Sequence, residues 1–210
     1  MSIIHSRTEA ERSSLYEQHK PRFDHYLSVL KEWNRSVNLF ARSKNVDVLA
    51  DLLLPCLACA ESSLLDSGST GVDLGSGGGF PGVVLAIARP DVNILLTERV
   101  RKKTSFLALA IQELQLTNVT LFLDDIKCLP DKKEFDFITA RYFSDTANIF
   151  SFARSHLKAV GSMLLFKPDS AAEELASQEW SIADKISVGP ERSLFQLKYD
   201  DSSNTESRTA

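Results

Sequence analysis

The sequence contains no uninterrupted apolar run long enough to span a membrane, and its first residues, MSIIHSRTEAERSS, lack the apolar centre of a signal peptide. Cysteine is also scarce. The three cysteines are an odd number in a chain without a secretion signal, which indicates reduced thiols and not a disulfide framework. From these absences we expect a cytoplasmic protein that does not bind a membrane.

An excess of positive charge is absent as well. The 24 lysines and arginines face 28 aspartates and glutamates, so the formal net charge is -4 and binding to nucleic acid through overall charge is not indicated. Any such contact must use a local patch. The 210 residues suit one sizeable core with a small extension. We expect a helical extension over residues 1–65, a main domain over residues 66–200 and a disordered polar tail over residues 201–210.

What the sequence does have is a dense glycine segment, GVDLGSGGGFPG, from Gly71 to Gly82. Its first residues suit the end of a buried strand, and the glycines then allow positive φ and let a ligand approach the backbone N–H groups. Pro81 suits the first turn of a helix, because its φ is already near the helical value and its missing N–H needs no partner. This helix is expected to end before Pro90. The order strand, glycine turn and helix predicts the first βα unit of a nucleotide-type binding fold.

The glycine spacing helps to separate the possible ligands. A dinucleotide fingerprint, G-x-G-x-x-G, that starts at Gly75 fails at Phe80, although a shifted match exists at residues 77, 79 and 82. The pattern D-x-G-x-G-x-G from Asp73 to Gly79 resembles instead the first motif of S-adenosylmethionine-dependent methyltransferases. In that motif the acidic residue lies near the amino end of the methionine moiety. A glycine turn that is merely flexible remains a third interpretation.

Apolar runs and helical patterns alternate along the rest of the main domain. Strands are predicted at residues 71–74, 92–97, 119–123, 135–139 and 162–166, with a closing antiparallel pair at 185–188 and 193–199. Helices are predicted after the second strand and over residues 145–157. These elements make a seven-stranded, mostly parallel α/β sheet with helices on both faces.

Within the first 61 residues, the sequence pattern predicts helices. Pro21 is expected to divide the pattern over residues 9–33, and a second apolar helix is expected over residues 46–61. Cys56 and Cys59 form C-x-x-C inside that helix, where we interpret them as small packed residues, because redox or zinc chemistry needs a different context. Residues 1–45 carry eight basic and five acidic side chains, which suits a solvated helix face as well as an RNA-binding arm.

Charged residues follow the predicted strands. Ligands of open α/β sheets bind at the carboxyl ends of the strands. Glu98 stands about 20 residues after the glycine turn, where an acidic side chain accepts hydrogen bonds from ribose hydroxyls. Arg141 follows the fourth strand, and its guanidinium could donate to a guanine base or a phosphate, or simply form a surface ion pair.

Taken together, these motifs resemble those of the bacterial methyltransferases that make 7-methylguanosine in 16S ribosomal RNA, the family also called glucose-inhibited division protein B. One part of the resemblance is the FPG ending of the glycine loop, and another is an N-terminal pattern formed by Tyr26, Leu30, Trp33, Asn34, Asn38 and Leu39. Further matches are Lys102, Phe106 and Leu107 after strand two, Phe135 and Asp136 at the start of strand four, Arg141 at its end, and Lys167 after strand five.

The resemblance implies a Rossmann-like class I S-adenosylmethionine-dependent methyltransferase. Its cofactor would be S-adenosyl-L-methionine and its partner 16S ribosomal RNA or the small ribosomal subunit, with no metal and as a monomer. Arg141 and Lys167 are the candidate catalytic residues, and Lys167 would also help to hold RNA. The candidate cofactor-binding residues are Asp73, Gly75, Ser76, Gly77, Gly79, Phe80, Glu98, Asp125, Ile126, Lys127 and Arg141.

Several positions depart from the family pattern. The family's small residue and glutamate near the adenine are here Ile126 and Lys127, so we expect Asp125 to supply the carboxylate. Glu98 replaces an aspartate, and Phe40 replaces a threonine. An arginine-histidine pair and an aspartate-serine pair of the family are replaced by Ala50, Asp51, Leu54 and Pro55.

The implied chemistry needs few special groups. Guanine N7 has a free lone pair, so no base has to remove a proton, and catalysis reduces mainly to alignment and exclusion of water. The segment ARYF after strand four contains no N-P-P-Y-like motif of amino-adenine methyltransferases. Three alternatives stay open: a methyltransferase for a different substrate, a non-catalytic S-adenosylmethionine- or RNA-binding relative, and a nicotinamide-dependent oxidoreductase.

Overall fold

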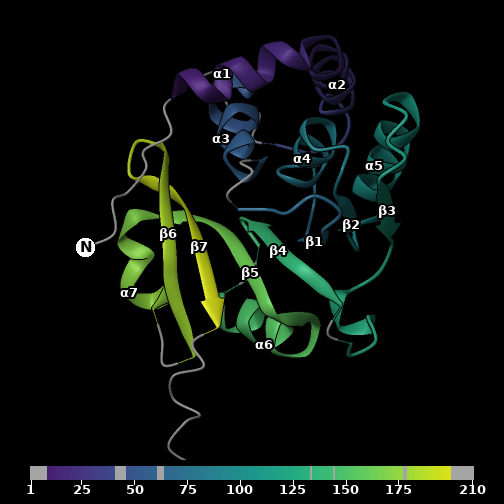
Figure 1. The fold of residues 1–210 in the computed structure, drawn as a ribbon. Helices are drawn as coiled ribbons and strands as arrows, with labels where there is room; N and C mark the ends of the chain where they lie inside the picture. Colours follow the sequence, from purple (N-terminus) through teal and green to yellow (C-terminus); the bar gives the residue numbers. More distant parts are fainter. Residues whose placement is uncertain are drawn as a thin grey trace, which may run out of the picture.

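A seven-stranded sheet in the order β3-β2-β1-β4-β5-β7-β6 forms the centre of the computed structural model (Figure 1). Residues 9–40, 46–60, 64–132, 134–143, 145–176 and 179–199 are described, and the predicted polar tail lies outside them. The first five strands pair in parallel, and β7 lies antiparallel between β5 and β6. The strands are β1 (Thr70–Leu74), β2 (Asn93–Thr97), β3 (Val119–Phe122), β4 (Phe135–Arg141), β5 (Leu157–Pro168), β6 (Trp180–Gly189) and β7 (Arg192–Tyr199). The predicted fold class is confirmed.

The helical elements agree with the predicted pattern and add three short ones. The long helices are α1 (Glu9–Gln18), α2 (Lys20–Trp33), α4 (Gly82–Ala88), α5 (Arg101–Glu113) and α6 (Thr146–His156). The predicted helix over residues 46–61 is a continuous run of η1 (Val48–Leu53), α3 (Leu54–Cys56) and η2 (Leu57–Ala60). The elements that the periodicity did not predict are η3 (Ile126–Cys128), η4 (Asp169–Ala171) and α7 (Ala172–Leu175).

Two strands begin well before their predicted boundaries. β6 begins at Trp180 and not at Lys185. β5 begins at Leu157, directly after α6, and not at Ser162. Leu157 pairs with Phe135 through an irregular register, and the residues between Leu157 and Ser162 are Lys158, Ala159, the exposed Val160 and Gly161. Without apolar alternation, these residues carry no strand pattern that sequence reasoning could detect.

Each face of the sheet has its own core. Alternation along β4 sends Phe137 to one face and Ile138 and Ala140 to the other. The Phe137 side is covered by α4, α5 and the N-terminal helices, and the opposite side by α6 and α7 (Figure 1). The carboxyl ends of the central parallel strands therefore lie between two helical layers.

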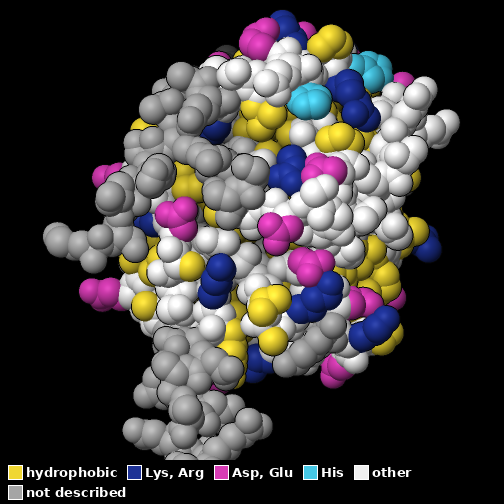
Figure 2. Space-filling view, in the orientation of Figure 1, with side chains coloured by type: hydrophobic (Ala, Val, Ile, Leu, Met, Phe, Trp, Pro, Cys, Tyr) yellow, Lys and Arg dark blue, Asp and Glu magenta, His cyan; other side chains and the backbone are white. Residues whose placement is uncertain are grey.

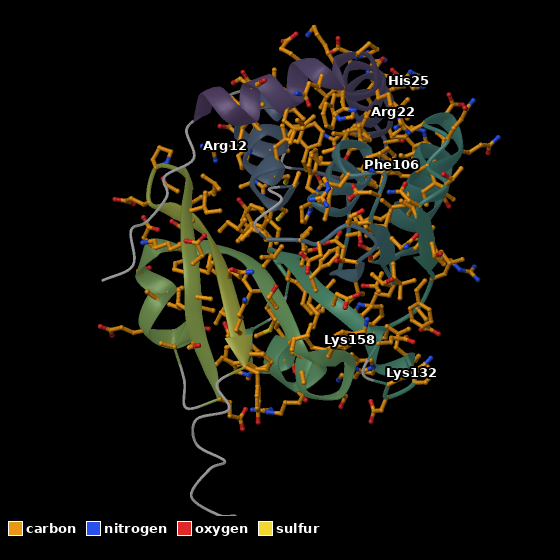
Figure 3. The ribbon with its side chains drawn as sticks, in the orientation of Figure 1. Arg12, Arg22, His25, Phe106, Lys132 and Lys158 are labelled. Atoms are coloured by element: carbon orange, nitrogen blue, oxygen red, sulfur yellow. The ribbon has the colours of Figure 1, made fainter. Side chains whose placement is uncertain are left out.

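The N-terminal helices are attached at both ends of the sheet. As predicted, Pro21 marks a helix boundary, since α2 begins beside it after a break at His19. Arg22 Nη2 donates to Leu114 O at 2.8 Å and His25 Nε2 lies 3.3 Å from Glu113 Oε2, which hold α2 against the end of α5 (Figure 3). At the other side, Arg12 Nη1 donates to Ser187 O of β6 at 3.1 Å.

The described surface is mixed in charge. On the face shown in Figure 2, the coloured lysine and arginine side chains are interspersed with aspartate and glutamate, with no extended area of one sign among the described residues. None of the described helices combines the length and the apolar character needed to cross a membrane. In the same part of the chain, no three metal-ligating side chains are grouped so that they could hold an ion.

Candidate active site

A cavity of about 730 Å³ opens at the carboxyl ends of β1 to β4. The glycine turn, the ends of β2 and β3, the segment after β4 and one face of α6 line it. Ligands of open α/β sheets bind at this edge. The cavity brings together five of the predicted cofactor-binding residues: Gly75, Glu98, Asp125, Ile126 and Lys127.

The glycine turn borders the cavity through Gly75. Gly75, Gly77 and Gly79 have φ of +65°, +57° and +87°, the left-handed conformation that glycine adopts without steric cost. A Cβ atom at Gly75 would lie 2.5 Å from the ring of Phe143, so only glycine allows this ring to close over the turn. The turn thus requires glycine both for its backbone shape and for the packing of the cavity wall.

The N–H groups of the turn are already used inside the protein. Gly75 N donates to Thr97 Oγ1 at 3.1 Å, Ser76 N to Thr97 O at 2.8 Å and Gly77 N to Glu98 Oε2 at 3.1 Å. In this conformation the three N–H groups are bonded within the protein, and the predicted approach of a ligand to the backbone of the turn stays a prediction. These hydrogen bonds fasten the turn to the end of β2, and Ser76, only 2% exposed, does not line the cavity.

Asp73 lies outside the cavity wall. Its Oδ1 accepts a hydrogen bond from Thr139 Oγ1 at 2.8 Å and its Oδ2 accepts one from Gly82 N at 3.2 Å. Burial raises the pKa of Asp73 to about 6, although hydrogen bonds from Thr139, Ser76 and Gly82 oppose that shift. The carboxylate ties β1 to β4 and to the start of α4, so its predicted contact with the methionine moiety stays a prediction.

Two carboxylates do line the cavity. Glu98 Oε1 accepts from Val100 N at 2.8 Å and Oε2 accepts from Gly77 N at 3.1 Å. Asp125 Oδ1 accepts from Lys127 N at 3.1 Å, and its Oδ2 accepts from Arg99 Nη1 at 3.2 Å. Each carboxylate oxygen has a second lone pair. Both side chains are therefore held in place while they keep acceptor capacity for a ligand.

Arg141 does not point into the cavity. The side chain is 9% exposed, and its guanidinium donates to Leu52 O at 2.7 Å, to Asp51 O at 2.8 Å and to Cys56 Sγ at 3.1 Å. Pro55 has no N–H and cannot donate to the carbonyl of Asp51 four residues earlier, and that carbonyl accepts from Arg141. The structure thus places Arg141 as a link between β4 and the N-terminal helices, and its predicted contact with the cofactor stays a prediction.

The N-terminal helices also contact the glycine turn. Tyr26 Oη donates to Gly78 O, and the Tyr26 ring packs against Phe80 with 5.7 Å between ring centroids. A Cβ atom at Gly79 would lie 2.9 Å from Tyr26 Oη. Gly79 and Phe80 therefore meet the helices and not the cavity, and their predicted cofactor contacts stay predictions.

Residues 19–189 match the GidB family, described as rRNA small subunit methyltransferase G. The chain belongs to the GidB family. The predicted family and its class of enzyme, the methyltransferases, are confirmed by this match.

Curated relatives agree with the family match. The ribosomal RNA small subunit methyltransferase G of Laribacter hongkongensis is 36% identical over 152 residues, which cover 72% of each chain. That of Lachnoclostridium phytofermentans is 30% identical over 164 residues, which cover 76% of this chain and 68% of the relative. The solved structure of P. horikoshii TYW2 in complex with MeSAdo has a TM-score of 0.58 at 13% identity and covers 70% of this chain and 62% of that one. This last likeness shows the fold alone.

The N-terminal pattern quoted for the GidB family has a packing role in this chain. Tyr26 and Leu30 face the glycine turn, and Trp33 packs against Phe106 of α5 at 6.0 Å. Asn34 is buried, and its Oδ1 accepts from Leu39 N at 2.8 Å and from Phe40 N at 3.1 Å, so it shapes the turn after α2. These residues hold the N-terminal helices over the back of the glycine turn.

Lys167 lies at the same sheet edge but not in the cavity wall. Its Nζ donates to Thr146 Oγ1 at 3.1 Å, and Thr146 in turn is hydrogen-bonded to Glu174. Half-buried at the end of β5, it remains within the carboxyl edge that RNA would have to approach. Its predicted catalytic role stays a prediction.

Sequence reasoning missed one wall of the cavity. The exposed Tyr142 and the half-buried Phe143 line it after β4, and α6 adds a face of residues three or four apart: Asn148, Ser151, Phe152, Ser155 and His156. His156 Nε2 is buried without a hydrogen-bond partner among the described residues. The sequence contained one signal of this wall: the small polar residues Asn148, Ser151 and Ser155 lie on one face of an otherwise apolar helix.

Proposed function

We propose that this protein transfers the methyl group of S-adenosylmethionine to N7 of a guanosine in 16S ribosomal RNA of the small subunit. The observation that carries the proposal is the cavity in which a glycine turn meets Glu98 and Asp125, in a chain of the GidB family. Its volume of about 730 Å³ lies within the range of small-molecule sites.

The residues present fit this cofactor. Glu98 offers carboxylate oxygens where ribose hydroxyls bind in nucleotide folds, and Asp125 offers an acceptor for the exocyclic amine of adenine. Ile126 and Lys127, beside Asp125, add apolar surface and backbone to the same wall. The departure from the family's glutamate at residue 127 is thus offset by the acidic residue two positions earlier.

The bound cofactor supplies an electrophilic methyl group, which leaves sulfur as the lone pair of guanine N7 forms the new bond to carbon. The protein does not need to move a proton, because N7 carries none. Its task is to hold the base in line with the methyl group and to keep water out. Phe143, which packs over Gly75, provides an apolar cover at this place.

The decisive experiment uses small ribosomal subunits that lack the modification. They are incubated with the protein and labelled S-adenosylmethionine, and the RNA is then mapped by mass spectrometry. We expect one labelled guanosine, methylated at N7. If no guanosine carries label while the protein binds S-adenosylmethionine in calorimetry, the proposed reaction is wrong.

One observation favours a second candidate, a relative that binds cofactor and RNA without turnover. Arg141, predicted to bridge cofactor and guanine, uses its donors on the N-terminal helices. The same experiment separates the two functions, because a non-catalytic relative would bind subunits and S-adenosylmethionine without transferring label. Titration with a nicotinamide dinucleotide in parallel tests the oxidoreductase alternative.

We further propose that the protein works as a monomer in the cytoplasm, with residues 1–65 as a helical extension and residues 66–200 as the methyltransferase domain. The shared packing of α2 with α4 and α5 supports an extension that forms one body with the sheet. Lys167 is retained as a candidate RNA contact, because it lies at the cavity edge of the sheet.

A further inference from the structure

Tyr142 stands at the mouth of the cavity in a conformation that the local sequence does not explain. It follows β4, lines the cavity and is 74% exposed. Its φ is +55°, in the left-handed region that few residues other than glycine occupy. Such strained positions persist only where surrounding structure holds them, and they gather at functional sites. An exposed aromatic ring held in this way calls for a binding partner.

Two arginines hold the ring. Arg192 Nη1 donates to Tyr142 Oη at 2.6 Å, and the guanidinium of Arg192 lies 5.8 Å from the ring centroid. Arg141 lies 5.3 Å from the same centroid. Arg192 begins β7 opposite Pro168 at the end of β5, so the β6–β7 turn reaches the edge where the cavity opens. Three quarters of Tyr142 nevertheless remain exposed, which leaves ring surface free.

Among the described residues, only one other tyrosine or phenylalanine is exposed. Tyr199 is 45% exposed, packs edge-on against Trp180 at 5.3 Å and lies at the opposite end of β7 from Arg192. It does not line the cavity. Tyr199 is therefore a matched control. Its substitution shows what the loss of an exposed tyrosine does to RNA binding when that tyrosine lies outside the cavity.

We propose that Tyr142 is the platform on which the target guanine stacks, and that Arg192 holds the platform and uses its remaining donors on a phosphate of the same RNA strand. This rests on the proposed function. A base that is methylated on its ring must leave its own stack, and enzymes commonly replace the lost stacking with an aromatic side chain. Arginine suits the phosphate because its planar guanidinium has five donors, only one of which Tyr142 uses.

The test measures methyl transfer at varied RNA concentration with saturating S-adenosylmethionine. Tyr142→Ala should raise the KM for RNA about 10-fold or more, the loss expected for one stacked base. Tyr142→Trp should keep a KM near that of the wild type, because it keeps a stacking face. Arg192→Ala should raise the KM for RNA as well and weaken its dependence on salt, since a phosphate contact is lost. Tyr199→Ala should leave the RNA KM unchanged.

Calorimetry with S-adenosylmethionine and a melting curve accompany each variant. If Tyr142 is the stacking platform, the Tyr142→Ala variant keeps its cofactor affinity and its folded state while its RNA binding weakens. An unchanged RNA KM in Tyr142→Ala overturns the inference and leaves the proposed function intact. So does a joint loss of RNA and cofactor binding, which indicates a collapsed cavity. If Tyr142→Ala does not fold, an unchanged KM in Arg192→Ala overturns it. If the wild-type protein labels no guanosine, the proposed function itself is wrong.

Discussion

Pro55 and Arg141 form one structural unit, although they lie 86 residues apart in the chain. Pro55 has no N–H to donate to the carbonyl of Asp51, and Arg141 donates to that carbonyl from the end of β4. Burial of a guanidinium is tolerated because carbonyls accept from it. A residue predicted to contact substrate thus serves as a tie between two parts of the fold.

Arg141→Ala is expected to destabilise the protein by about 2–4 kcal/mol, because hydrogen bonds of a buried charged group are lost. Urea unfolding measures the change. Arg154→Ala is the control: Arg154 is half-exposed and paired with Glu179 at the surface, so its loss should cost about 1 kcal/mol or less. Equal effects of the two substitutions would contradict the tie between β4 and the N-terminal helices.

Asp73 makes stability depend on pH in an unusual direction. Its folded pKa of about 6 lies above the ordinary value of 3.8, so the folded state binds more protons than the unfolded state between these values. The contribution of Asp73 to stability is complete below pH 4 and is lost as the pH rises through 6. Most surface carboxylates with ion pairs act in the opposite sense.

As the pH rises from 4 to 7, the free energy of unfolding of Asp73→Asn should therefore increase relative to that of the wild type. The expected increase is about 2–3 kcal/mol, because each unit of pKa shift corresponds to about 1.4 kcal/mol. Unfolding free energies of both proteins across this range measure it. Asp91→Asn is the contrasting control. The hydrogen bond from Arg89 lowers the pKa of Asp91 to about 2, so Asp91 stabilises above pH 4 and loses that effect as the pH falls toward 2. A difference between wild type and Asp73→Asn that does not change with pH would refute the assignment.

At the scale of elements, the strand, glycine turn and helix of residues 70–88 were readable from the sequence because each depends on local chemistry. Gly75 permits a positive φ and Pro81 restricts φ wherever these residue types occur, and the apolar runs on either side are continuous. The strand of residues 157–161 was not readable, because it exists only through pairing with β4.

Gly79→Ala tests whether the turn requires glycine at this position. Gly79 has φ +87°, and a Cβ there would lie 2.6 Å from Val83 Cγ2. Gly68 provides the matched control with φ +81° and nothing within 4 Å of an added Cβ. Gly68→Ala should cost about 1 kcal/mol from backbone conformation alone. Gly79→Ala should cost about 1–3 kcal/mol more through steric overlap.

The same Gly79→Ala variant should bind S-adenosylmethionine more weakly in calorimetry, since the turn that borders the cavity is displaced. The Gly68→Ala protein should bind it as the wild type does, because Gly68 lies before β1 and outside the cavity wall. Equal stability losses in the two alanine variants would show that the contact with Val83 does not restrict the turn.

At the scale of the whole molecule, the N-terminal helices and the sheet share one hydrophobic core. Phe23 and Leu30 of α2 lie in the same cluster as Val84 of α4 and Phe106 of α5. We therefore expect the extension and the sheet to unfold together. The chain's two tryptophans report on the two parts, since Trp33 ends α2 and Trp180 begins β6.

Trp33→Phe and Trp180→Phe leave one tryptophan each. In both variants, the fluorescence transition in urea should coincide with the transition of the same variant in circular dichroism. If Trp33 reports an earlier transition than circular dichroism does, the extension unfolds as a separate domain, and the proposed unity of the core fails.

The sequence by itself determined the order of strands and helices, the glycine turn and the family, because propensity, periodicity and motif spacing are properties of neighbouring residues. It also placed Glu98 and Asp125 at the cavity, since the ends of parallel strands meet at one sheet edge. Only the tertiary structure decided that Asp73 is buried, that Arg141 turns to the N-terminal helices and that Tyr142 faces the mouth of the cavity. These outcomes depend on partners 66, 90 and 50 residues away, whose positions no local pattern encodes.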